Sequence, residues 1–292
     1  MATHQIHLIV TSLACLLLAG CQSTSVSQSV HPTPEAAFSA LTTALKADDF
    51  AGVERLTGMK PGEIGSGDSV QDAADRDLVL NKAAKGITVR ESDNNLSWID
   101  CGSDAWTFPI PLKHGSDGTW SFDAATGREE IHNRVIGRNE LATLATLRGL
   151  VRAQWSYYAM DPDKDGRKSY AARVFSTPGT RDGLYWESGA GDKASPVGPM
   201  LATAESKGYT SLRDGGVPYE GYHYKILDAQ PDSFVIVAWP ASYRKSGVMT
   251  FVATERGWLY EKDLGTLTSS RAKSVSTKQV RDSWSPVNTF GQ

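Results

Sequence analysis

The longest helical pattern in the chain lies in its middle. Apolar residues recur there at steps of three and four, the period of one apolar helix face, at Leu141, Leu144, Ala145, Leu147, Val151, Trp155 and Tyr158. The nearby Arg138, Arg148 and Arg152 fall largely outside that face. Because the first proline after this pattern is Pro162, the spacing predicts a long amphipathic helix ending before it. We expect most later elements to cover its apolar face.

Other helix starts are predicted upstream of this pattern. Thr33 is placed to cap a first helix over residues 34–56. A sequence resembling a capping box opens a second helix over residues 69–85. A further box at residues 126–129 opens a helix that we expect Gly137 to break or kink.

Two regions have the alternating pattern of β-strands. Residues 87–122 alternate apolar and polar positions across two turn-forming sequences, which predicts a small antiparallel sheet. The C-terminal third contains four short runs separated by turns, at residues 222–227, 234–239, 248–254 and 258–262. Arg256-Gly257 indicates a tight hairpin between the last two.

Together these elements predict an α+β fold. N-terminal helices and a small antiparallel sheet are followed by a long helix packed on a C-terminal four-stranded antiparallel sheet. The latter arrangement resembles pilin-like globular domains. We expect residues 1–20 to be a signal peptide, 21–33 a lipidated cysteine and flexible tether, 34–125 an N-terminal α+β subdomain, and 126–292 a helix-plus-sheet subdomain.

The N-terminal end carries an export pattern. An apolar run over residues 8–19 has the length of a signal-peptide core, although no Lys or Arg precedes it. The following Leu18-Ala19-Gly20-Cys21 resembles the lipobox of bacterial lipoproteins, which implies cleavage before Cys21 and its acylation. Gln22, rather than Asp, follows. By analogy this implies a lipid anchor in the outer membrane, facing the periplasm, with inner-membrane anchoring left open.

Charge and cysteine content narrow the possible partners. The formal net charge of −3 includes no basic excess, so a nucleic-acid partner is not expected. Cys15 belongs to the predicted signal peptide and Cys21 to the lipid anchor, which leaves Cys101 without a disulfide partner. The nearby Trp98 and Trp106 favour a buried thiol.

An aspartate-rich loop follows the long helix. Asp161, Asp163 and Asp165 stand at alternate positions before Gly166, as at the start of an EF-hand calcium loop. The Arg167 carbonyl and Ser169 would complete a structural Ca²⁺ site, but Ala172 replaces the closing glutamate. The alternative interpretation is a solvated acidic turn.

Candidate catalytic residues are sparse. His31, His114, His132 and His223 show no metal-binding spacing, and only proximity in sequence joins Cys101 to His114. Aromatic residues are more numerous in the second half of the chain. Tyr170, Tyr185, Trp186 and Tyr222 are candidates for an aromatic surface that binds a peptide or glycan, with core packing as the alternative.

Several motifs in one order resemble a known bacterial family. They include Phe108-Pro-Ile-Pro-Leu112, Ser176-Thr-Pro-Gly179, Arg181-Asp-Gly-Leu-Tyr-Trp186, Ser246-Gly-Val-Met-Thr-Phe251 and Tyr260-Glu-Lys-Asp-Leu-Gly265. The family they resemble is DUF2950, whose members are mostly exported or lipid-anchored proteins of unknown role. The resemblance supplies no catalytic residues. Because the sequence contains no recognisable constellation of catalytic residues, we expect a non-catalytic envelope module that binds an envelope protein, peptide or glycan, with an envelope hydrolase as the alternative.

Overall fold

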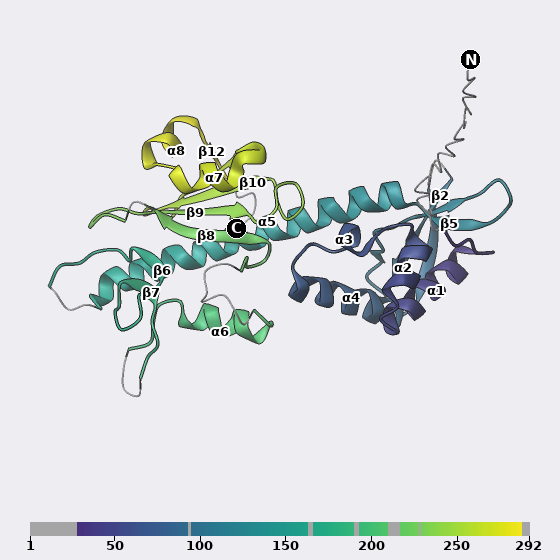
Figure 1. Ribbon diagram of the computed structural model, residues 1–292, viewed down its shortest axis with the longest axis horizontal. Helices are drawn as coiled ribbons and strands as arrows, with labels where there is room; N and C mark the ends of the chain where they lie inside the picture. Colours follow the sequence, from purple (N-terminus) through teal and green to yellow (C-terminus); the bar gives the residue numbers. More distant parts are fainter. Residues whose placement is uncertain are drawn as a thin grey trace, which may run out of the picture.

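One helix, α5 (Ala124–Met160), crosses the molecule and carries an assembly of elements at each end (Figure 1). The computed structural model describes residues 28–92, 95–162, 166–189, 193–209, 217–227 and 229–287. The predicted signal peptide and Cys21 lie outside the described residues, as does the tether up to residue 27. The predicted α+β class is confirmed. No helix in the described ranges is long and apolar enough to cross a membrane.

The N-terminal assembly packs four helices on a small sheet. The helices are α1 (Pro34–Lys46), α2 (Phe50–Thr57), α3 (Pro61–Ile64) and α4 (Ser69–Ala83). The sheet is antiparallel, in the order β1-β2-β4-β5 with β3 beside β2, and is formed by β1 (Ile87–Ser92), β2 (Leu96–Cys101), β3 (Trp106–Thr107), β4 (Leu112–His114) and β5 (Trp120–Phe122).

The helix caps explain where prediction and structure differ. Thr33 caps α1 as predicted, through its side chain and the Ala36 amide. The predicted first helix is two helices, because Asp48 has a positive φ of 53° and Asp49 caps α2. Asp68, not Ser69, caps α4.

Helix α5 is continuous over 37 residues and is capped by Asp123, whose side chain accepts a hydrogen bond from the Thr126 amide. Gly137 does not break it. Its first half contributes Ile131 and Val135 to the N-terminal core. Its second half contributes other apolar side chains, Leu147, Leu150, Val151 and Tyr157, to a second core. The helix is therefore shared by both cores, and the division of the chain at residue 126 stays a prediction.

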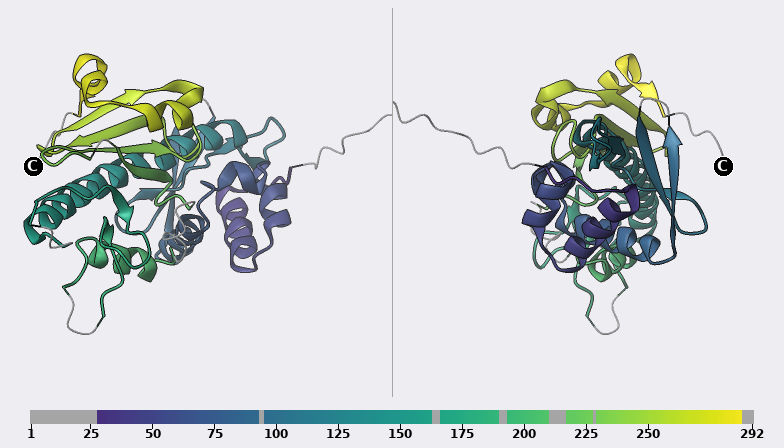
Figure 2. Two further views of the ribbon diagram at one scale, coloured as in Figure 1. Left: turned by 60° about the vertical axis from the view of Figure 1, so that its left-hand side comes forward. Right: turned by 90° about the vertical axis from the view of Figure 1, so that its right-hand side faces the viewer.

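The C-terminal sheet lies on the second half of α5. Its order is β12-β11-β10-β9-β8, all antiparallel, from β8 (Tyr222–Leu227), β9 (Val235–Pro240), β10 (Met249–Thr254), β11 (Leu259–Asp263) and β12 (Ser285–Pro286). The four predicted strands are present, and β12 adds a fifth. Helices α7 (Thr268–Arg271) and α8 (Thr277–Ser283), with 3₁₀ turns at Gly265–Leu267 and Ala272–Ser274, cover the opposite face (Figures 1 and 2). Every residue of β9 is consequently buried.

Two polar side chains at the middle of α5 fix the sheet along the helix. The buried Asn139 amide donates to the Ser246 carbonyl at 2.9 Å. Glu140 accepts hydrogen bonds from the Val248 and Met249 amides at 2.9 and 3.0 Å. These contacts hold the start of β10 against α5 and set the position of the whole sheet.

Candidate functional site

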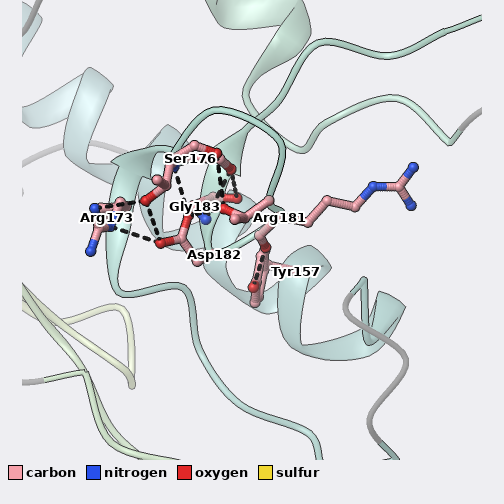
Figure 3. A network of polar contacts seen from close by, with 8 residues as sticks. Tyr157, Arg173, Ser176, Arg181, Asp182 and Gly183 are labelled. Atoms are coloured by element: carbon pink, nitrogen blue, oxygen red, sulfur yellow. Dashed lines mark hydrogen bonds and ion pairs between the residues drawn. The ribbon is translucent and has the colours of Figure 1, made fainter.

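The segment after α5 forms a small unit beside the C-terminal sheet. Strands β6 (Arg173–Phe175) and β7 (Gly183–Tyr185) pair in parallel, and α6 (Gly198–Ser206) follows. Gln154 of α5 holds the start of the unit, because its buried side chain exchanges two hydrogen bonds of 2.9 Å with the Ala171 backbone. Tyr157 donates to the Arg181 carbonyl at 2.6 Å (Figure 3).

Asp182 organises the turn between β6 and β7 (Figure 3). Its carboxylate accepts hydrogen bonds from the Thr177 amide at 2.8 Å, the Thr177 hydroxyl at 2.9 Å and the Thr180 hydroxyl at 2.8 Å, and pairs with Arg173 at 3.2 Å. Burial acts to raise the pKa of Asp182, but the hydrogen bonds from Thr180 and Thr177 and the charge of Arg173 outweigh it, so the pKa is lowered. Asp182 therefore fixes the loop as an ionised acceptor.

A cavity of about 620 Å³ lies between this unit and the edge of the C-terminal sheet. We call it the β8 groove. Residues from α5, the segment 172–175, α6, β8 with the turn before it, and the α7 region line it. Its volume falls within the range of small-ligand sites, about 300–1,000 Å³.

The two faces of β8 give the groove two chemically different sides. Side chains alternate along a strand, so Tyr224 and Ile226 lie on the face toward α5, where they meet apolar residues, Leu150, Val197, Met200 and Leu201. His223 and Lys225 lie on the other face with Trp239 and Lys273. One side of the groove is therefore apolar and the other polar.

The polar side carries positive charge. Lys273 lies over the Trp239 ring at 5.7 Å, and the His223 ring lies 5.5 Å from the same indole. Burial, together with the charge of Lys273, lowers the pKa of His223. Arg173 also lines the groove, with its charge balanced by Asp182, and the described residues of the lining include no Asp or Glu. The groove therefore favours an anionic group on this side.

The outer edge of β8 supplies backbone hydrogen-bonding groups. Tyr222 and Tyr219 exchange backbone hydrogen bonds of 3.1 and 2.9 Å, so the peptide groups of Tyr222 point away from β9. Because this direction alternates along an antiparallel strand, those of Tyr224 and Ile226 also point to the outer edge. No backbone partner for these two residues is found in the described part of the chain. Both line the groove.

The four aromatic residues expected to form a binding surface occupy two environments. Tyr222 and Trp186 are buried in the core between α5 and the sheet rather than lying on a surface. Tyr170 and Tyr185 are half-buried and pack against that core; Tyr170 contacts Phe234 with ring centroids 4.7 Å apart. A binding role for these residues stays a prediction.

The expected calcium residues are only partly described. Asp161 ends α5 in the left-handed conformation, with φ of 45°, and Arg167 and Ser169 lie in the segment that follows Gly166. Asp163 and Asp165 lie outside the described residues. Within the described ranges, no three His, Cys, Asp or Glu side chains are grouped to hold a metal ion. Calcium binding by this loop stays a prediction.

The structure separates Cys101 from the histidine considered as its partner. Cys101 ends β2 in the N-terminal core, whereas His114 lies in β4 beside the opposite end of β2, where its amide bonds to the Asn95 carbonyl. The predicted burial of Cys101 is confirmed. Burial raises the pKa of its thiol to about 11, so Cys101 is a neutral thiol near pH 7 and a poor nucleophile.

Except for His223, the residues that line the β8 groove were not among the candidate site residues predicted from the sequence. His223 and Lys225 alternate with Tyr222, Tyr224 and Ile226, and that alternation was the available signal for a strand with one basic face. Lys273 and Arg173 join them only through tertiary packing.

Comparison with known proteins gives one match. The model of the family described as "Protein of unknown function (DUF2950)" matches residues 28–287. No curated protein and no solved structure is significantly similar to the chain.

Proposed function

Because the chain belongs to the DUF2950 family, whose function is unknown, we propose a function from its own geometry. The protein is a non-catalytic binding module of the bacterial envelope. It holds an extended peptide, with alternating acidic and apolar residues, in the β8 groove. The observation that carries this proposal is the outer edge of β8, where the peptide groups of Tyr224 and Ile226 have no backbone partner in the described part of the chain, between an apolar and a basic wall.

Each property of the proposed peptide is complementary to one property of the groove. An extended backbone matches the peptide groups of Tyr224 and Ile226, as in recognition by strand addition. Alternate side chains of such a strand point to opposite sides. One set would meet the apolar wall at Leu150 and Met200, and the other would meet Lys225 and Lys273. This arrangement favours a peptide over a glycan, because a glycan has no repeating amide pattern to pair with β8.

Binding tests the proposal directly. The full chain carrying Cys21→Ser is titrated into a fluorescent Val-Glu-Val-Glu-Val-Glu peptide and its Gln-for-Glu counterpart. Replacing Lys225 and Lys273 together with Gln should weaken binding of the Glu peptide about tenfold, since each exposed charge pair contributes up to about 1 kcal/mol, and added salt should weaken it further.

A charge-matched double variant, Lys113→Gln with Lys278→Gln, removes two exposed lysines outside the groove lining and should bind as the parent does. Equal affinity for the Glu and Gln peptides, or binding of an acidic glycan fragment alone, would reject the peptide proposal. Turnover of the bound peptide would support the envelope hydrolase instead.

The proposed location rests on the residues Leu18 to Cys21 and Gln22. The module is anchored by acyl chains on Cys21 in the outer membrane, facing the periplasm, where envelope proteins would present such peptides. Cys21→Ser should release the protein from washed membranes, since several acyl chains are needed for durable anchoring. Membrane retention of the Ser variant after carbonate and high-salt washing would contradict the anchor.

A further inference from the structure

A second cavity, of about 500 Å³, lies in the N-terminal assembly, away from the β8 groove. We call it the N-terminal cavity. Apolar side chains from α1, α2, the segment 106–110 and α5 line it, among them Leu41, Val53, Phe108, Ile110, Ile131 and Val135. Protein interiors are normally packed to crystal-like density, so an apolar space of this size is a feature to be explained.

Helix α4 borders this cavity and packs on the N-terminal core through the partly buried Val79 and Ala83. None of its 15 residues is buried, and Leu78 is 39% exposed. Polar contacts also hold the helix. Arg76 pairs with Asp48 at 2.8 Å, and Arg138 of α5 pairs with Asp75 at 2.7 Å. Because no residue of α4 is fully buried, a small displacement of this helix exposes little apolar surface, which allows a ligand to enter beneath it.

Three arginines line the N-terminal cavity, Arg76, Arg134 and Arg138. Each forms an ion pair, with Asp48, Glu130 and Asp75 respectively. Nη1 of Arg138 bonds to both Asp75 oxygens, at 2.7 and 2.9 Å. Nε and Nη2 of Arg138 are shielded from solvent and have no hydrogen-bond partner among the described residues. Buried donors of a charged group are costly when left unpaired.

The two Arg138 nitrogens without a hydrogen-bond partner indicate which chemical group of a ligand would bind there. Nε and Nη2 form one edge of the planar guanidinium, and two parallel N–H bonds from such an edge fit a carboxylate. We propose that the N-terminal cavity binds a fatty acid, with its carboxylate on Arg138 and its acyl chain along the apolar wall.

The ligand is a free fatty acid rather than an acyl chain attached to the protein. Acyl groups on Cys21 would be esters and an amide, and so would offer Arg138 no carboxylate. A phospholipid brings two acyl chains, which a cavity of about 500 Å³ does not match.

Fluorescence of cis-parinaric acid tests the site in the full chain carrying Cys21→Ser. The probe should bind at one site and be displaced by palmitic acid but about tenfold less well by its methyl ester. Arg138→Met should weaken binding at least tenfold, because it removes charged hydrogen bonds. Ile131→Trp, which fills the cavity, should abolish binding. Arg90→Met, at an exposed arginine outside the cavity lining, serves as the matched control and should leave binding of the probe unchanged.

Thermal unfolding checks that each variant is folded at the assay temperature. If Arg138→Met leaves Asp75 unpaired and the protein unstable, binding to Ile131→Trp and displacement by the methyl ester still test whether the acid binds in the cavity through its carboxylate. Binding that survives Ile131→Trp would place the acid elsewhere. Equal displacement by the acid and its methyl ester would remove the role assigned to Arg138. Either result overturns the proposal.

Discussion

Replacing Gly183 with alanine should destabilise the protein by about 3 kcal/mol, the upper end of the cost of inserting a group into a packed site. A Cβ at this position would lie 2.6 Å from the Ser176 amide nitrogen and 2.7 Å from the Phe175 carbonyl carbon. Both are backbone atoms, so no side-chain rotation relieves the contact. Relief requires separation of β6 from β7, which also disturbs the Asp182 hydrogen bonds. The melting temperature should fall by about 6–12 °C.

Gly137→Ala is the matched control for this change. Apart from its chain neighbours and the backbone of α5, no atom lies within 4 Å of a Cβ at Gly137, and the residue lies inside continuous α5. Alanine is favoured over glycine in a helix interior by about 1 kcal/mol, so this variant should melt at a higher temperature than the parent. If Gly137→Ala destabilises as much as Gly183→Ala, neither the continuous helix nor the close approach of β6 and β7 is correct.

Tyr222→Ala should cost about 3–5 kcal/mol, as for other large aromatic side chains removed from a core. Tyr222 starts β8, is fully buried, and donates a 2.9 Å hydrogen bond to the Met249 carbonyl. Tyr222→Phe keeps the ring and loses this bond, so it should cost only about 1 kcal/mol. Urea unfolding with an unchanged slope would measure both losses.

Substitution of Gly247 tests whether the Tyr222 side chain occupies the position described. A Cβ on Gly247 would lie 2.1 Å from the Tyr222 hydroxyl oxygen. Gly247→Ala should therefore be strongly destabilising alone but nearly neutral in the Tyr222→Ala background, because the clashing group is gone. Additive losses in the double variant would show that Tyr222 does not occupy this position.

Most of the C-terminal fold could be predicted from the sequence because its strands have local patterns of apolar and polar residues. Four of the five strands of the C-terminal sheet follow apolar alternation within short runs. Strand β12 has only two residues, Ser285–Pro286, and forms through pairing with β11, so no local pattern predicts it. Helix α5 shows that tertiary packing can outweigh the low helix propensity of a single residue. Gly137 weakens a helix by about 1 kcal/mol, which packing of α5 against two cores exceeds.

Binding residues were harder to predict because tertiary structure brings them together. The aromatic character of Trp186 and Tyr222 suits a binding surface and a core equally well, and only burial distinguishes the two. The β8 groove joins Arg173, Lys225 and Lys273 from three separate segments. Likewise, the unpaired edge of Arg138 depends on where Asp75 lies across the N-terminal cavity.

Amide hydrogen exchange of Tyr224 and Ile226 tests peptide binding along β8 most directly. The outer edge carries these two amides, whereas those of His223 and Lys225 face β9. Saturation with the Val-Glu hexapeptide should slow exchange at Tyr224 and Ile226 by about tenfold or more, and should leave His223 and Lys225 unchanged. A peptide N-methylated at alternate residues, on its β8-facing edge, should give no such protection. Unchanged exchange at Tyr224 and Ile226 in the saturated complex would contradict strand addition at β8.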